Sequence, residues 1–148
     1  MHDATLLICY DGSDGARRAI DVAASLLTPR RAVVVDIGPP LTREESLAAL
    51  SPVSVVGYLE EENLADALTR ADEGTARARS AGFDAKARAE VAAPTWEGIV
   101  ELADELDAVA IVKGSRGLTG AREVFEGSLS HQVAEHAGRP VLVVPPPR

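Results

Sequence analysis

Glycine and serine residues follow a short apolar run at a spacing that suits phosphate binding. The run AVAIV covers residues 108–112, and Gly114, Gly117, Gly127 and Ser128 come after it, in the order Gly-x-x-Gly-(nine residues)-Gly-Ser. Glycine lets backbone N–H groups approach an anion closely, and the first N–H groups of a helix are unpaired donors at the positive end of its dipole. With a helix beginning at Ser128, this spacing predicts a phosphate cradle between a strand and a helix.

A purely structural interpretation of the same residues stays open. In it the glycines only shape an irregular loop, and Ser128 only caps the helix. Arg116 and Arg122 stand inside the spacing, and each is either a phosphate ligand or a solvated loop residue. We favour the phosphate interpretation because one loop supplies both a nest of N–H groups and a helix start.

The spacing resembles that of the universal stress protein family, whose nucleotide-binding members carry G-2x-G-9x-G-[S/T] after the fourth strand. The match includes the GSRG opening at residues 114–117 and the Gly127-Ser128-x-Ser130 close. CYDGSDGARRAI, residues 9–20, resembles the first strand, turn and first helix of the family, and RPVLVVP, residues 139–145, resembles its last strand. The resemblance therefore implies one universal stress protein domain over residues 1–148.

The resemblance also implies a ligand, ATP with Mg²⁺, and the residues that contact it. In the family pattern the residue at the position of Ile37 meets adenine through its backbone. Asp11 is expected to accept hydrogen bonds from ribose hydroxyls or to help hold Mg²⁺, or else to brace the Asp-Gly-Ser turn, and these roles are compatible. The nucleotide contacts implied in this way are Cys9, Asp11, Ile37, Lys113, Gly114, Arg116, Gly117, Gly127, Ser128, Leu129 and Ser130.

Two residues depart from the pattern of many relatives. Asp36 stands where they have histidine, and it brings a negative charge near the base pocket, in a direction that the sequence leaves open. Lys113 stands where they have methionine. It either adds a cation near the nucleotide or extends from the sheet edge to solvent.

Strand-like and helix-like patterns alternate along the chain, which indicates a parallel sheet covered on both faces. We expect an α/β fold with a single doubly wound parallel five-stranded sheet in the order 3-2-1-4-5, flavodoxin-like and similar to the adenine nucleotide alpha hydrolases. In such a sheet the turn after strand one and the loop after strand four share one rim. The predicted strands are residues 5–10, 32–37, 85–91, 108–112 and 141–144.

Four helices are predicted between these strands. Ser13 is the expected N-cap of the first, Pro94 and Thr95 open the third, and the last covers residues 128–137. Residues 38–58 are expected to form a long connection of undefined form. The second helix, residues 59–80, has an apolar face, while its acidic run and its later arginines are expected in solvent. That face is formed by Leu64, Ala67, Leu68, Ala71 and Ala78.

Composition excludes several classes of function. The net charge of −8 opposes a nucleic-acid surface, because binding to phosphate backbones depends on clustered Lys and Arg. The apolar runs are too short for a bilayer span and the N-terminus has no signal-peptide core, so we expect no membrane partner and a cytoplasmic location. Cys9 is the only cysteine in the sequence, so no internal disulfide can form. Its position in the first strand predicts an inert thiol.

Other nucleotide folds and catalytic sites lack their signatures here. There is no G-x-x-x-x-G-K-[ST] and no G-x-G-x-x-G after the first strand, and too few aromatic residues to sandwich a flavin. No Ser-His-Asp or Cys-His set falls on the expected rim, and Trp96 is expected to pack rather than to stack on a base. We therefore expect no enzyme beyond slow ATP hydrolysis or autophosphorylation.

The leading hypothesis is a nucleotide-binding stress-response sensor or adaptor. The alternative is a nucleotide-free domain of the same fold that acts as a dimeric interaction module. Under both hypotheses we expect a homodimer, because universal stress proteins commonly pair through the last strand. Without a partner, the apolar edge of this strand would be uncovered. That edge consists of Val141, Leu142, Val143 and Val144.

Overall fold

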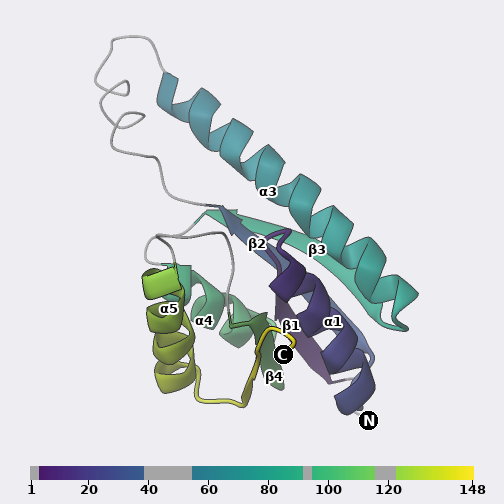
Figure 1. The fold of residues 1–148 in the computed structure, drawn as a ribbon. Coiled ribbons are helices and arrows are strands. Elements are labelled where there is room, and N and C mark those ends of the chain that lie inside the picture. The colour runs from purple at the N-terminus through teal and green to yellow at the C-terminus, as the bar shows by residue number, and fades with distance from the viewer. Residues whose placement is uncertain (1–3, 39–54, 92–94, 116–122) are drawn as a thin grey trace.

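A computed structural model describes residues 4–38, 55–91, 95–115 and 123–148 (Figure 1). Strands and helices alternate through these ranges. Their order is β1 (Thr5–Cys9), α1 (Asp14–Leu26), β2 (Arg31–Gly38), α3 (Val55–Ser80), β3 (Asp84–Val91), α4 (Thr95–Glu105), β4 (Ala110–Gly114), α5 (Glu123–His136) and β5 (Val141–Val144).

The strands form one parallel sheet in the order β3-β2-β1-β4-β5, which confirms the predicted fold. The central strand, β1, is paired on both sides, with Leu7 opposite Val33 of β2 and Ile111 of β4. Helices α1 and α3 lie along one face of the sheet, and α4 and α5 cover the other (Figure 1). The carboxyl ends of β1, β2 and β4 therefore meet along one edge.

Burial on both faces explains why the central strands are nearly continuous apolar runs. Leu6 and Ile8 of β1 belong to the core beneath α1 and α3, whereas Leu7 between them belongs to the core beneath α4 and α5. All three side chains are almost completely buried. A polar residue near these strand ends is therefore an exception that needs a partner.

Helix boundaries follow local signals in the sequence. The side chain of Ser13 accepts a hydrogen bond from the backbone N–H of Ala16 at 3.1 Å, which confirms it as the N-cap of α1. Gly82 and Gly138 follow α3 and α5 with φ of 104° and 60°, in the region where glycine avoids the strain that a side chain would cause.

Strand β4 and helix α5 do not begin where predicted. Strand β4 begins at Ala110 instead of residue 108, because the N–H of Ala108 still bonds to the carbonyl of Ala103 at the end of α4. Helix α5 begins at Glu123, so Ser128 lies within the helix and is not its N-cap. A glycine inside a helix costs only about 1 kcal/mol, so Gly127 does not prevent this earlier start.

Helix α3 is longer than predicted, and its apolar face is only partly buried. It begins at Val55, inside the segment expected to be an undefined connection. Of the residues on the predicted apolar face, Ala67, Ala71 and Ala78 are fully buried, but Leu64 and Leu68 are 42% and 44% exposed. The N-terminal part of α3 extends past the ends of the strands (Figure 1), so the sheet no longer covers it. Within the described residues, no helix combines the length and apolar character of a membrane span.

Candidate functional site

A cavity with a volume of about 100 Å³ opens at the carboxyl edge of the sheet. Its wall is formed by the ends of β1, β2 and β4 and by residues of α1, α4 and α5. Ligands of doubly wound folds bind at this edge. The lining residues are Cys9, Tyr10, Asp11, Ser13, Ala16, Val35, Asp36, Ile37, Thr95, Ile99, Lys113, Gly114 and Leu129.

The structure brings together six of the predicted contact residues, and whether they contact a nucleotide stays a prediction. Ser130 does not line the cavity but is hydrogen-bonded to a lining residue, Lys113. Arg116 and Gly117 lie outside the described residues, and for Gly127 and Ser128 only the helical backbone is described. The six that line the cavity are Cys9, Asp11, Ile37, Lys113, Gly114 and Leu129.

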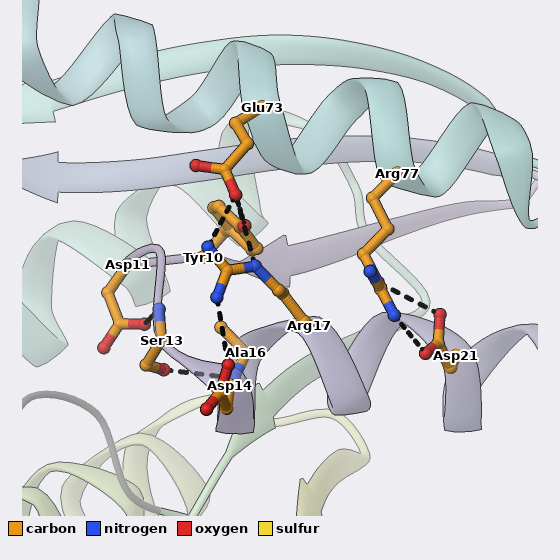
Figure 2. Close-up of polar contacts among 9 residues, drawn as sticks. All are labelled: Tyr10, Asp11, Ser13, Asp14, Ala16, Arg17, Asp21, Glu73 and Arg77. Carbon is orange, nitrogen blue, oxygen red and sulfur yellow. Dashed lines mark hydrogen bonds and ion pairs between the residues drawn. The ribbon is translucent and has the colours of Figure 1, made fainter.

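Asp11 braces the turn between β1 and α1 and also lines the cavity. One of its carboxylate oxygens, Oδ1, accepts a hydrogen bond from the backbone N–H of Ser13 at 2.9 Å (Figure 2). Gly12 between them has a φ of 81°, which a residue with a side chain rarely adopts. The structural role expected of Asp11 is therefore present, and its place in the wall leaves the ligand role open.

Tyr10 forms a cavity wall that is held by both α1 and α3. Its hydroxyl donates to Glu73 Oε1 at 2.8 Å, and the Arg17 guanidinium donates to the same oxygen at 2.7 Å (Figure 2). Burial of the ring, together with the bond to Glu73, raises the pKa of Tyr10 to about 12. Arg17 also contacts Asp14 at 3.1 Å. These bonds connect the first turn of α1 to the middle of α3.

Asp36 points toward α3 and forms an ion pair there. It is only 3% exposed, and its two carboxylate oxygens accept from Arg70 Nε at 2.6 Å and Nη2 at 3.3 Å. Burial raises the pKa of the Asp36 carboxyl, and the Arg70 guanidinium opposes that rise. The expectation that the arginines of this helix are merely solvated is thus wrong for Arg70. Sequence reasoning missed the pair because 34 residues separate its members.

Lys113 is buried in the wall of the cavity. Its Nζ donates to the carbonyl oxygen of Gly114 at 2.7 Å and to Ser130 Oγ at 2.6 Å. Of the two alternatives for Lys113, the one in which it extends from the sheet edge to solvent is wrong, because the residue is only 5% exposed. Burial raises the pKa of the nearby Cys9 thiol to about 12, although the charge of Lys113 lowers it. The thiol is therefore protonated at neutral pH, as its strand position predicted.

Several lining residues were not predicted, although they share a recognisable position. Tyr10 and Ser13 flank the turn after β1, while Thr95 and Ile99 lie in the first turns of α4. Residues just after parallel strands or at the start of the next helix approach the edge of such sheets where ligands bind. This position could have identified them from the sequence. Trp96 stacks on His136 with ring centroids 4.5 Å apart, consistent with packing.

Comparison with known proteins identifies the family. The model of the universal stress protein family matches residues 4–145. The chain belongs to this family. Universal stress protein YxiE of Bacillus subtilis (strain 168) is 28% identical over 149 residues, which cover 94% of this chain and 97% of YxiE.

Solved structures of the same fold include one with a nucleotide. The hypothetical protein MJ0577 superimposes with a TM-score of 0.79 at 22% identity, over 100% of this universal stress protein and 99% of MJ0577. A universal stress protein solved in complex with cAMP has a TM-score of 0.64 at 28% identity, and the match covers 95% of this chain and 96% of that one. In the described part of the present chain, no group of three or more His, Cys, Asp or Glu side chains is arranged to hold a metal ion.

Proposed function

We propose that this universal stress protein binds an adenine nucleotide, ATP with Mg²⁺, in the cavity at the strand ends. The composition of the wall carries the proposal. Asp11 offers acceptor oxygens for ribose hydroxyls, Lys113 offers a cation for phosphate, and Ile37, Ile99 and Leu129 supply apolar surface for a base. The related universal stress protein that was solved with cAMP supports the same class of ligand.

The role we propose is that of a stress-response sensor or adaptor rather than a catalyst. The Cys9 thiol, with a pKa of about 12, is a poor nucleophile at neutral pH. The carboxylate of Asp36 is bound to Arg70, and that of Asp11 accepts from the backbone of its own turn. These side chains favour holding a ligand over activating a water molecule.

Two measurements test nucleotide binding. Mass spectrometry of the ligand released by heating the purified protein is expected to find an adenine nucleotide. Calorimetry with ATP and MgCl₂ then compares the wild type with Leu129→Trp, which fills the cavity, and with Leu26→Trp, which makes the same change at a side chain that is 66% exposed. Heat of binding is expected for the wild type and for Leu26→Trp, and none for Leu129→Trp. No heat from the wild type, or equal heat from all three, contradicts the proposal.

We also propose a homodimer that pairs through β5, the terminal strand of the described sheet. The carbonyls of Pro140 and Val144 accept hydrogen bonds from Ile111 of β4 and from Ser115 just after it, so alternation along the strand directs the N–H of Val143 away from β4. Val143→Pro therefore removes an outward donor while keeping the pairing with β4. An interface here also suits the alternative function, a nucleotide-free interaction module.

Light scattering tests the dimer. The wild type is expected at twice the chain mass of 15.5 kDa, and Val143→Pro at the mass of one chain. Val143→Thr keeps the backbone donor and is the matched control, which is expected to remain a dimer. A wild type that is monomeric at micromolar concentration contradicts the interface.

A further inference from the structure

Asp36 is a buried carboxylate in the wall of the cavity. It is 3% exposed, and it lines the cavity near the end of β2 together with its neighbours Val35 and Ile37. Moving a carboxylate from water into a protein costs free energy, so a buried carboxylate needs hydrogen-bond donors around it. The partner that supplies these donors determines what else the carboxylate can bind.

Arg70 is that partner, and it uses the two carboxylate oxygens unequally. Its Nε donates to Asp36 Oδ2 at 2.6 Å, whereas its Nη2 donates to Oδ1 at 3.3 Å. The second distance is longer than the roughly 2.7–2.9 Å that is typical of charge-assisted bonds. The two oxygens of a carboxylate together accept about four hydrogen bonds. Oδ1 is therefore the more weakly bonded oxygen, and it retains capacity for another donor.

The guanidinium reaches Asp36 from the side of α3. Arg70 is not among the described residues of the cavity wall, and its stem passes the turn after β1, where a Cβ at Gly12 would lie 3.7 Å from Arg70 Cδ. Asp36 itself is part of the wall. Because Arg70 occupies the α3 side of the carboxylate, a further donor approaches it from the cavity.

The strand order places Asp36 at one end of the proposed ligand. Strand β1 lies between β2 and β4. Asp11 follows β1, and Gly114, the last residue of β4, opens the glycine spacing that predicts phosphate binding. Neighbouring strands lie about 4.8 Å apart, so about 10 Å separates β2 from β4. A nucleotide with its phosphate near β4 and its sugar near β1 therefore has its base near β2, where Ile37 supplies apolar surface beside Asp36.

We infer that Asp36 is the base-selecting residue of the cavity: its carboxylate accepts a hydrogen bond from the exocyclic amino group of the base, so that the site prefers 6-aminopurines. This inference rests on the proposed nucleotide-binding function and adds to it the feature of the base that is recognised. A purine with a carbonyl oxygen at this position is disfavoured, because that oxygen and the carboxylate are both acceptors. A hydrogen bond to a charged group favours the correct base by roughly tenfold to a hundredfold.

Binding of AMP and of purine riboside 5′-monophosphate measures this selection, because the second ligand differs from AMP only in lacking the amino group. Calorimetry gives the ratio of its Kd to the Kd of AMP. Wild-type protein is compared with Asp36→Leu combined with Arg70→Met, which removes both charges and leaves neither buried alone. The matched control is Asp21→Leu combined with Arg77→Met, which removes a similar ion pair between α1 and α3 outside the described wall (Figure 2). The ratio is expected to be about tenfold or more in the wild type and the control, and near one in the first double variant.

Asp36→Asn tests the inference with a second pair of ligands. An asparagine amide donates as well as accepts, so it can form a hydrogen bond with the carbonyl oxygen of hypoxanthine. The ratio of the IMP Kd to the AMP Kd is therefore expected to fall about tenfold in Asp36→Asn. A purely structural role of Asp36 would weaken both ligands equally and leave this ratio unchanged. Urea unfolding without ligand shows whether each variant is folded.

The outcomes distinguish this inference from the proposed function. A wild type that binds AMP and purine riboside 5′-monophosphate equally overturns the role of Asp36 and leaves nucleotide binding intact. A wild-type preference that persists without the carboxylate assigns the amino group to another partner and overturns the inference as well, as does an unchanged IMP ratio in Asp36→Asn. A wild type that binds none of these nucleotides overturns both the inference and the function it rests on.

Discussion

A Cβ atom at Gly114 would lie 2.9 Å from both the carbonyl carbon and the carbonyl oxygen of Gly15. The end of β4 thus touches the backbone of the first turn of α1, and neither obstacle is a flexible side chain. Gly114 opens the Gly-x-x-Gly spacing that predicted a phosphate cradle. Its lack of a side chain is required by the packing of a helix against a strand, whether or not a phosphate binds nearby.

Gly114→Ala is expected to destabilise the protein by about 1–3 kcal/mol without any nucleotide, because the added methyl group forces the backbone of α1 away from β4. Urea unfolding measures the loss. Ser115→Ala is the control: the backbone N–H of residue 115 still donates to the carbonyl of Val144, and the change adds no atoms, so the unfolding midpoint should stay near that of the wild type. A Gly114→Ala protein as stable as this control would show that the contact is relieved at no cost.

Local signals made most of the fold predictable. Alternating apolar runs specified the strands, and the cap at Ser13 and the glycines at 82 and 138 marked helix ends that the structure confirms. The rim shared by the turn after β1 and the end of β4 followed from the strand order. Each of these features depends on residues that are close in sequence or on a general rule of parallel sheets.

Features that depend on distant contacts were not predictable. The partner of Asp36 is set by where α3 crosses the sheet, which no spacing in the sequence specifies. The exposure of Leu64 and Leu68 depends on how α3 packs against the rest of the fold, although their periodicity is that of a buried face. The start of α5 before Ser128 was missed because serine is a common cap but is also tolerated within helices.

The contact between Gly74 and Tyr10 predicts a coupled pair of mutations. A Cβ at Gly74 would lie 2.6, 2.7 and 3.0 Å from three atoms of the Tyr10 ring. Gly74→Ala is therefore expected to cost about 1–3 kcal/mol in the wild type, and less in a Tyr10→Ala background, where the ring is absent. Urea unfolding of the four proteins measures the coupling. Equal costs in both backgrounds would place the clash elsewhere.

The buried pair of Asp36 and Arg70 predicts an asymmetric response to mutation. Arg70→Met leaves the Asp36 carboxylate buried without its guanidinium and is expected to cost about 2 kcal/mol at pH 7, less than for a fully enclosed pair because Arg70 is 36% exposed. Asp36→Leu combined with Arg70→Met removes both charges and is expected to recover most of the loss. A double variant no more stable than Arg70→Met alone would contradict this account.

The loss in Arg70→Met is also expected to depend on pH. Burial already raises the pKa of Asp36 in the folded wild type, and removal of Arg70 raises it further. The folded variant then binds a proton more tightly than the unfolded chain, so its free energy of unfolding rises as the pH falls from neutrality toward the ordinary carboxyl pKa. The gap between wild type and variant should narrow over that range. A gap that widens on acidification would show that Asp36 is not the titrating group.

The raised pKa of the half-buried Cys9 thiol predicts slow alkylation. Its pKa of about 12, against an ordinary value of 9.0, leaves roughly a thousandfold less thiolate at pH 8 than an unperturbed thiol has. Iodoacetamide is therefore expected to modify the folded protein at least that much more slowly than the protein unfolded in urea. Comparable rates in the two states would mean that the thiol is open to solvent.

The same thiol predicts weaker folding in alkali. Its pKa is higher in the folded protein than in the unfolded chain, so above pH 9 the unfolded chain loses the proton first, and the free energy of unfolding falls as the pH rises from 9 to about 12. Tyr10, whose pKa is also about 12, adds a similar decline above pH 10. Cys9→Ala removes only the first contribution. Urea unfolding at a series of pH values measures the free energy of unfolding of both proteins. For Cys9→Ala it should fall less steeply than for the wild type, and the fall should begin near pH 10 instead of pH 9. Parallel curves for the two proteins would show that Cys9 does not titrate with folding.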